Sequence, residues 1–171
     1  MSLQTPPSAP EFSHIVRAHE IGGVKKGLML EANKVECAAL AARFGLINLD
    51  RLTAALEIKR EATGIRITGQ VHGQGAQPCV ASAEPVPFLV TERIALFLTE
   101  AAQNDSEMEL SSDDLDVDPL DSDVIDLGEI AAQAFALGLD LYPRLPGSVA
   151  GVINEDDAIA LHSPFAVLKK G

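Results

Sequence analysis

Residues 52–71 read LTAALEIKREATGIRITGQV, in which two alternating runs lie on either side of a short turn. In the first run Leu56 and Ile58 alternate with charged residues, and a second alternating run covers residues 65–71. Alternation with a period of two is typical of a strand with one buried face. Gly64 closes the intervening turn, so the two runs predict a β-hairpin.

Further strands and helices are predicted around this hairpin. Residues 88–98 alternate like a third strand, and residues 12–16 resemble a short one. Residues 33–44 have apolar side chains at helical spacing, with an Asn to cap the first turn and a Gly to end the helix. A second helix is expected after Asp126, which has the spacing of a capping box with Glu129.

The predicted elements define a fold class. Strands joined by short turns, with two to three helices, predict an α+β fold with a mainly antiparallel sheet, either open or barrel-like. We expect residues 1–10 to be a flexible tail and residues 11–171 to be a single domain. Within that domain, residues 73–75 (Gly-Gln-Gly) are interpreted as a loop or bulge. Residues 164–168 are expected to anchor a surface-hugging C-terminal segment.

The charge is unevenly distributed. The chain has a formal net charge of −12, and the stretch from Glu100 to Asp140 holds 13 acidic residues but no Lys or Arg. Residues 103–124 contain few large apolar side chains, so we expect a long exposed acidic loop there. Such a loop attracts basic partners and repels phosphate backbones. The residues expected to contact a basic partner are Asp113, Asp114, Asp116, Asp118, Asp121 and Asp123.

The charge totals also bear on nucleic-acid binding and on location. The basic composition that is typical of a nucleic-acid-binding domain is absent. A local basic face remains open, formed by Lys25, Lys26, Lys59, Arg60, Arg66 and Arg93. The two cysteines make no disulfide framework, the N-terminal residues have no signal-peptide pattern, and every apolar run is far shorter than the ~20 residues that span a bilayer. We therefore expect a cytoplasmic protein without membrane contact.

No motif for catalysis or metal binding is complete. Residues 114–118 match the opening of a calcium-binding loop, but Pro119 stands where that loop needs Gly and Ile125 where it needs Glu. Cys79 has Ser82 at the position that would complete a C-x-x-C pair. Cys37 falls on the apolar side of its predicted helix, where an inert buried thiol is usual. We expect no metal, no cofactor and no enzymatic activity.

Three segments carry a family resemblance: residues 77–86 (QPCVASAEPV), 125–129 (IDLGE) and 142–144 (YPR). Their order and spacing resemble the bacterial YceD family of large ribosomal RNA subunit accumulation proteins, in its alpha-proteobacterial form. The likeness covers roughly residues 12–168. Ser82 stands where many relatives have a second Cys, and Ala83 replaces a usual Leu. The matching positions are Cys79, Glu84, Pro85, Asp126, Leu127, Glu129 and Pro143.

The resemblance implies a function. It implies a non-enzymatic factor that supports the synthesis, processing or stability of 23S ribosomal RNA during biogenesis of the large ribosomal subunit. The expected partner is a basic ribosomal or rRNA-processing protein, with indirect or weak direct contact to 23S rRNA. Two alternatives stay open: an acidic protein–protein adaptor unrelated to ribosomes, and an Mg²⁺-dependent RNA hydrolase that uses carboxylates of the acidic loop.

Overall fold

The computed structural model describes residues 10–99 and 116–147. Several predictions therefore lie outside the described residues: most of the N-terminal tail, the candidates Asp113 and Asp114, and the apolar anchor at 164–168. Within the described ranges, no helix has the length and apolar character needed to cross a membrane. The elements in chain order are β1 (Ile15–Arg17), the 3₁₀ helix η1 (Ala18–Glu20), β2 (Lys26–Glu31), α1 (Lys34–Phe44), β3 (Asn48–Glu61), β4 (Gly64–Pro78), β5 (Pro85–Thr99), β6 (Asp116–Pro119), β7 (Val124–Asp126) and α2 (Leu127–Leu137).

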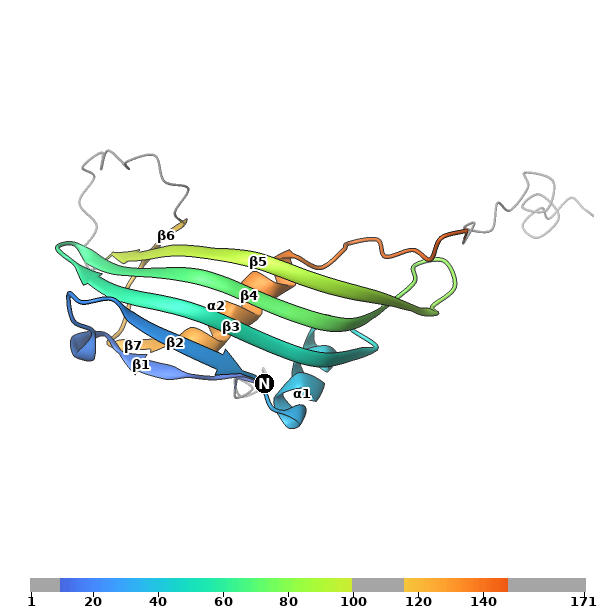
Figure 1. The fold of residues 1–171 in the computed structure, drawn as a ribbon, viewed down its shortest axis with the longest axis horizontal. Helices are drawn as coiled ribbons and strands as arrows, with labels where there is room; N and C mark the ends of the chain where they lie inside the picture. The colour runs from blue at the N-terminus through green and yellow to red at the C-terminus, as the bar shows by residue number, and fades with distance from the viewer. Residues whose placement is uncertain (1–9, 100–115, 148–171) are drawn as a thin grey trace, which may run out of the picture.

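A five-stranded sheet forms the body of the molecule, in the order β2-β3-β4-β5-β6 (Figure 1). Neighbouring strands are antiparallel except β6, which runs parallel to β5. A separate two-stranded sheet pairs β1 with β7. Among the described residues β2 and β6 do not pair with each other, so the sheet is open and no closed barrel forms. The predicted α+β class with a mainly antiparallel sheet is confirmed.

The predicted hairpin is confirmed and is longer than the alternation indicated. Strands β3 and β4 pair from Asn48↔Ala76 to Glu61↔Gly64, which leaves a two-residue turn. The predicted third strand is β5, and each of these three strands has 14 or 15 residues, whereas typical strands have about 5–6. The predicted strand at 12–16 is shifted, since β1 begins at Ile15 and Phe12 is buried before it. Strand β2 was not predicted.

The interpretation of residues 73–75 as a loop is wrong, whereas the alternative interpretation as a bulge is confirmed in part. These residues lie within β4 and pair in unbroken register with β5. On the other side the register with β3 shifts, since Leu49 pairs with Gly75 and Arg51 with Gln74, so that Asp50 is an extra residue as in a β-bulge. A Cβ atom added at Gly73 would lie 2.6 Å from Cδ2 of Phe135, and one at Gly75 would lie 3.0 Å from the ring of Phe88. Gly73 therefore leaves room on the inner face of the sheet for the Phe135 ring, whereas a Cβ atom at Gly75 would meet the Asn48 carbonyl oxygen of β3 before it met the Phe88 ring.

Both helices begin at the predicted caps. Asn33 accepts hydrogen bonds from the backbone N–H groups of Val35 and Glu36, and the Glu36 carboxylate accepts one from the Asn33 N–H, which completes a capping box. Asp126 caps α2 in the same way. The predicted capping box at α2 is nevertheless only half formed, because the Glu129 carboxylate binds Arg43 and Gln133 instead.

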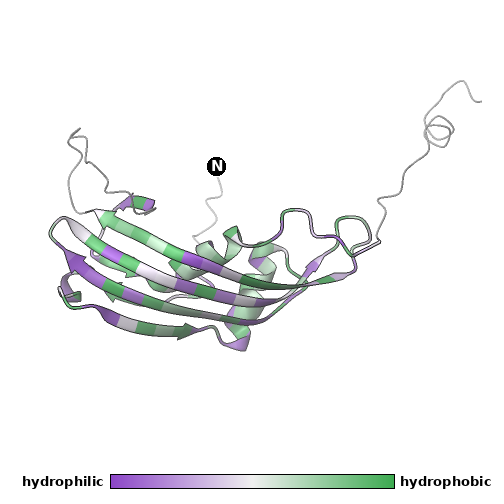
Figure 2. Cartoon of the chain, turned by 45° about the horizontal axis from the view of Figure 1, so that its top comes forward, coloured by the Kyte–Doolittle hydropathy of each residue, from purple (hydrophilic) through white to green (hydrophobic). Residues whose placement is uncertain are grey.

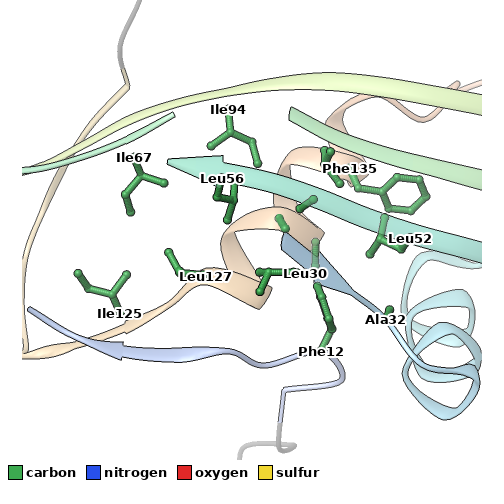
Figure 3. Packing of buried hydrophobic residues seen from close by; sticks show 14 of the residues in the cluster. Phe12, Leu30, Ala32, Leu52, Leu56, Ile67, Ile94, Ile125, Leu127 and Phe135 are labelled. Atoms are coloured by element: carbon green, nitrogen blue, oxygen red, sulfur yellow. The ribbon is translucent and has the colours of Figure 1, made fainter. Parts of the chain in front are cut away.

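One hydrophobic core lies between the helices and one face of the sheet. Helix α1 packs against β3, and α2 packs against β4 and β5. Figure 3 shows Leu56, Ile67 and Ile94 of the sheet near Leu127 and Phe135 of α2. Hydrophobic and hydrophilic residues alternate along the strands (Figure 2), and the hydrophilic positions form an outer face that neither α-helix covers. This uncovered side is called the outer face below.

The predicted acidic loop is wrong for residues 116–119, which form the edge strand β6. Asp116, Val117, Asp118 and Pro119 pair in register with Leu96 to Thr99, and the Leu120 N–H donates to the Thr99 carbonyl at 2.9 Å. Backbone pairing with an open sheet edge orders this segment without burying apolar area, and its side chains remain exposed. Composition predicted the exposure, but it gave no sign of the pairing.

Candidate functional site

Three of the acidic candidates lie exposed at one edge of the sheet. Asp116 and Asp118 belong to β6, and Asp121 follows directly after it. Within the described part of the chain, none of the three forms an ion pair or a side-chain hydrogen bond. Their carboxylates are therefore available to a basic partner, and they are called the acidic edge below.

Asp123 does not belong with them, because its carboxylate is engaged within the protein. It accepts hydrogen bonds from the backbone N–H of His19 at 3.0 Å and pairs with His19 Nδ1 at 2.6 Å, while Arg17 lies 3.7 Å away. The His19 backbone N–H, followed by the His19 ring and Arg17, lowers the Asp123 pKa below its usual range. Asp123 thus joins the β7 region to η1 and is a structural residue.

The positions Cys79, Glu84 and Pro143 meet at one end of the sheet. Between β4 and β5 the chain makes a tight turn in which the Cys79 N–H donates to the Glu84 carbonyl at 2.8 Å. The Ala83 N–H donates back to the Cys79 carbonyl at 2.8 Å, and Ala83 takes a left-handed φ of 59°. The Val80 N–H donates to the Pro143 carbonyl at 2.9 Å. Cys79 and Pro143 are both buried, and Pro85 begins β5 directly after the turn.

Gln77 belongs to the same junction and was missed as a site residue. Its side chain is 8% exposed, and Nε2 donates to the Asp140 carbonyl at 2.9 Å. A buried amide must find a partner, and this bond ties β4 to the segment that follows α2. Gln77 is the first residue of the QPC motif, but the motif does not indicate that the Gln77 side chain is buried.

Asp126, Leu127 and Glu129 form a second junction around the start of α2. Besides capping the helix, Asp126 accepts hydrogen bonds from the Ser13 hydroxyl at 2.6 Å and the His14 N–H at 2.8 Å. The Leu127 N–H donates to the His14 carbonyl at 2.9 Å, and the Leu127 side chain is 1% exposed. These two residues therefore hold the N-terminal segment against α2.

Glu129 binds the guanidinium of Arg43 through two parallel hydrogen bonds of 2.8 and 2.7 Å, and Arg43 also donates to Glu11 at 3.0 Å. This fork geometry is stronger than a single-contact ion pair. The hydrogen bonds from Arg43 hold the pKa of Glu129 below its usual range. The pair joins α1 to α2, which lie 86 residues apart at these positions.

Glu129→Gln is expected to lower the free energy of unfolding by on the order of 1 kcal/mol at pH 7, because the side chains are partly exposed. A carboxyl group with a lowered folded-state pKa stabilises the fold above its unfolded value of about 4.3, and that contribution is lost as pH falls through the folded value. The difference between variant and wild type should therefore shrink below about pH 4. Urea titrations at several pH values check this, with Glu20→Gln as control, since Glu20 is exposed and forms no ion pair within the described ranges. A pH-independent difference would contradict the ion-pair explanation.

The outer face brings together four of the six basic candidates. Lys59, Arg66 and Arg93 point outward by register and burial, and Lys25 reaches this face through Glu57, 3.2 Å from its Nζ. The other two do not join them. Arg60 is half-buried and donates to the carbonyl oxygens of Ile21 and Ala18, while Lys26 occupies a position of the opposite parity on β2.

The charges on the outer face are partly paired. Arg51 lies 3.0 Å from Glu31, and Arg66 lies 2.8 Å from Glu61. Lys59 and Arg93 form no ion pair with any residue of the described ranges. A shallow hollow of about 560 Å³ opens on this face beside Arg93. The small residues Gly27 and Ala55 line this hollow. The sequence did not predict it, because the residues around it come together only when β2, β3, β4 and β5 pair.

Cys37 and Cys79 are both free thiols in the described part of the chain. Both are buried, and burial raises the pKa of the Cys37 thiol. In residues 10–99 and 116–147, no three His, Cys, Asp or Glu side chains are arranged to hold a metal ion. Cys37 donates to the Ala32 carbonyl and belongs to the core.

Compared with known proteins, the chain matches no family model, no curated protein and no solved structure. The resemblance to the YceD family rests on the sequence motifs quoted above.

Proposed function

We propose that this chain is a non-enzymatic factor of the YceD type, which supports the accumulation of 23S ribosomal RNA during assembly of the large ribosomal subunit. The observation that carries the proposal is the placement of the family-like positions. Cys79, Glu84 and Pro143 converge at one junction, although 64 residues separate the first from the last. Positions that share one structural role are expected to recur together in a family, so their joint presence supports the resemblance.

The acidic edge supports a basic protein as the partner. Asp116, Asp118 and Asp121 lie on or beside a strand whose outer backbone edge has no partner among the described residues. A basic ribosomal or rRNA-processing protein is attracted to such a cluster over a Debye length of about 8 Å at physiological salt. The charges act mainly on the association rate, so binding should weaken as salt rises.

The first experiment is deletion of the gene in its host, read out as the ratio of 23S to 16S ribosomal RNA. The proposal expects a selective fall in 23S that the wild-type chain restores. An unchanged ratio with normal subunit profiles would contradict the proposal and would favour the alternative of an acidic protein–protein adaptor. Incubation of the pure protein with rRNA, with and without Mg²⁺, tests the hydrolase alternative, since the proposal expects no cleavage.

Asp116→Asn together with Asp118→Asn is expected to restore the 23S ratio only in part, because the acidic edge loses two of its three charges. The side chains are exposed, so folding should change by less than about 0.5 kcal/mol. Glu20→Gln with Asp50→Asn removes the same charge elsewhere on the surface and should restore the ratio fully. Equal restoration by both double variants would show that the acidic edge contributes nothing to the function.

A further inference from the structure

The hollow on the outer face arises from strand pairing. Met29, Ala55, Gln70 and Arg93 form one row across β2, β3, β4 and β5, since Met29 pairs with Ala55, Ala55 with Gln70 and Gln70 with Arg93. The neighbouring row begins with Gly27 opposite Glu57. Gly27 and Ala55 carry almost no side chain, so the longer side chains around them enclose a depression of about 560 Å³.

The side chains around this hollow suit a flat, polar-edged ring. Met29 is 75% exposed, although it lies on a strand and large apolar side chains are normally buried. A thioether and a guanidinium both stack well on aromatic rings. Gln70 supplies an amide donor and acceptor, and Glu57 supplies a carboxylate, which are the groups that read base edges by hydrogen bonding.

The charge around the hollow suits a phosphate backbone. The outer face carries five cationic side chains, Lys25, Arg51, Lys59, Arg66 and Arg93, against the three carboxylates of Glu31, Glu57 and Glu61. The excess is positive although the whole chain has a net charge of −12. The Arg66 guanidinium also lies 5.8 Å from the centroid of the Phe97 ring. Lys59 is opposite Arg66 on the neighbouring strand, so both cations lie at the same end of the outer face.

We propose that the outer face binds single-stranded RNA, with one unpaired base in the hollow between Met29, Gln70 and Arg93 and with Lys59 and Arg66 near the flanking phosphates. This inference rests on the proposed function for its choice of RNA as the relevant polyanion. Polar hydrogen-bonding groups and net positive charge favour RNA over a protein occupant, which would need a larger apolar contact.

The test measures fluorescence anisotropy of a labelled mixed-sequence RNA of about ten nucleotides, a length within the usual footprint of a single-strand-binding fold. Ala55→Leu fills the hollow without changing the charge and should weaken binding by about tenfold or more, the effect of losing one stacked base. Arg93→Glu should weaken binding and reduce the slope of log affinity against log salt. A fully paired duplex should bind more weakly than the single strand, because its bases are not free to enter the hollow.

Lys34→Glu is the matched control for Arg93→Glu, since it makes the same change of charge on α1, away from the outer face. Circular dichroism confirms that each variant is folded. No binding by the wild-type chain near 100 mM salt, where non-specific affinity is still measurable, would overturn the inference. Equal weakening by Arg93→Glu and Lys34→Glu, or an unaffected Ala55→Leu, would also overturn it, because binding would then be non-specific.

The 23S ratio in the deletion strain separates this inference from the proposed function. If the deletion lowers 23S but the pure chain binds no RNA, the inference fails and the function stands. If the chain binds RNA through the hollow but the deletion leaves 23S unchanged, the function fails and the site stands. If Ala55→Leu fails to restore 23S although the wild-type chain binds no RNA, a protein occupies the outer face and the inference is wrong.

Discussion

Phe135→Ala is expected to remove about 3–5 kcal/mol from the free energy of unfolding, a large part of the 5–15 kcal/mol that is typical of a whole domain. The Phe135 side chain is fully buried where α2 crosses the sheet. Its ring centroid lies 6.0 Å from that of Phe44 in an edge-on arrangement and 5.9 Å from that of Phe88. Truncation leaves a cavity bounded by α1, α2 and β5, which a rigid sheet cannot fill by collapse.

Urea titration followed by far-UV circular dichroism measures the effect, since the chain has no Trp for fluorescence. Leu137→Ala is the control, because Leu137 lies on the same helix and is 84% exposed. It should change stability by less than about 0.5 kcal/mol. A loss below about 1 kcal/mol for Phe135→Ala would contradict the packing described here.

Gly73 provides a second readout of the same contact. Gly73→Ala alone should destabilise the fold, because the new methyl group would overlap the Phe135 ring. In the Phe135→Ala background that overlap is gone, so the added methyl group should cost much less. A double-mutant cycle therefore predicts a coupling of about 1–3 kcal/mol between the two positions. Additive effects would show that Gly73 does not make room for the ring.

The elements predicted correctly from the sequence are those fixed by neighbouring residues. Alternation on either side of Gly64 and the caps at Asn33 and Asp126 depend on residues within a few positions of each other. Their physical causes are the strand period and the unsatisfied N–H groups at helix starts, both of which are visible in a short window of sequence. The hairpin and both helices were therefore predictable.

The features that were missed depend on residues far apart in the chain. Strand β6 is ordered by pairing with β5. Glu129 binds Arg43 of α1 instead of the backbone N–H of Asp126, which a capping box would require. Gly73 resembled a turn residue because only the fold brings Phe135 over it. The hollow on the outer face joins four strands, so no segment of the sequence shows it. Burial and pairing across 20 or more residues are decided by tertiary packing, which local patterns do not encode.

Gly128→Ala is expected to lower the free energy of unfolding by about 1–3 kcal/mol, the usual range for overpacking. A Cβ atom at Gly128 would lie 2.6 Å from the Phe12 carbonyl oxygen and 2.9 Å from the His14 backbone nitrogen. Both are backbone atoms, so the segment before β1 would have to move as a whole. Asp126 and Leu127 hold that segment through His14, and the movement would strain both bonds.

Helix propensity opposes this effect, because Ala is favoured over Gly by up to about 1 kcal/mol in a helix interior. At Gly128 the clash is expected to exceed that gain, because no flexible side chain is available to yield. Gly22→Ala is the matched control, since a Cβ atom there meets nothing within 4 Å. Amide hydrogen exchange gives a second measurement: Gly128→Ala should speed exchange at His14 and Leu127, whose N–H groups make the affected bonds. If Gly128→Ala were as stable as Gly22→Ala and left those two amides protected, the close approach of α2 to the N-terminal segment would be contradicted.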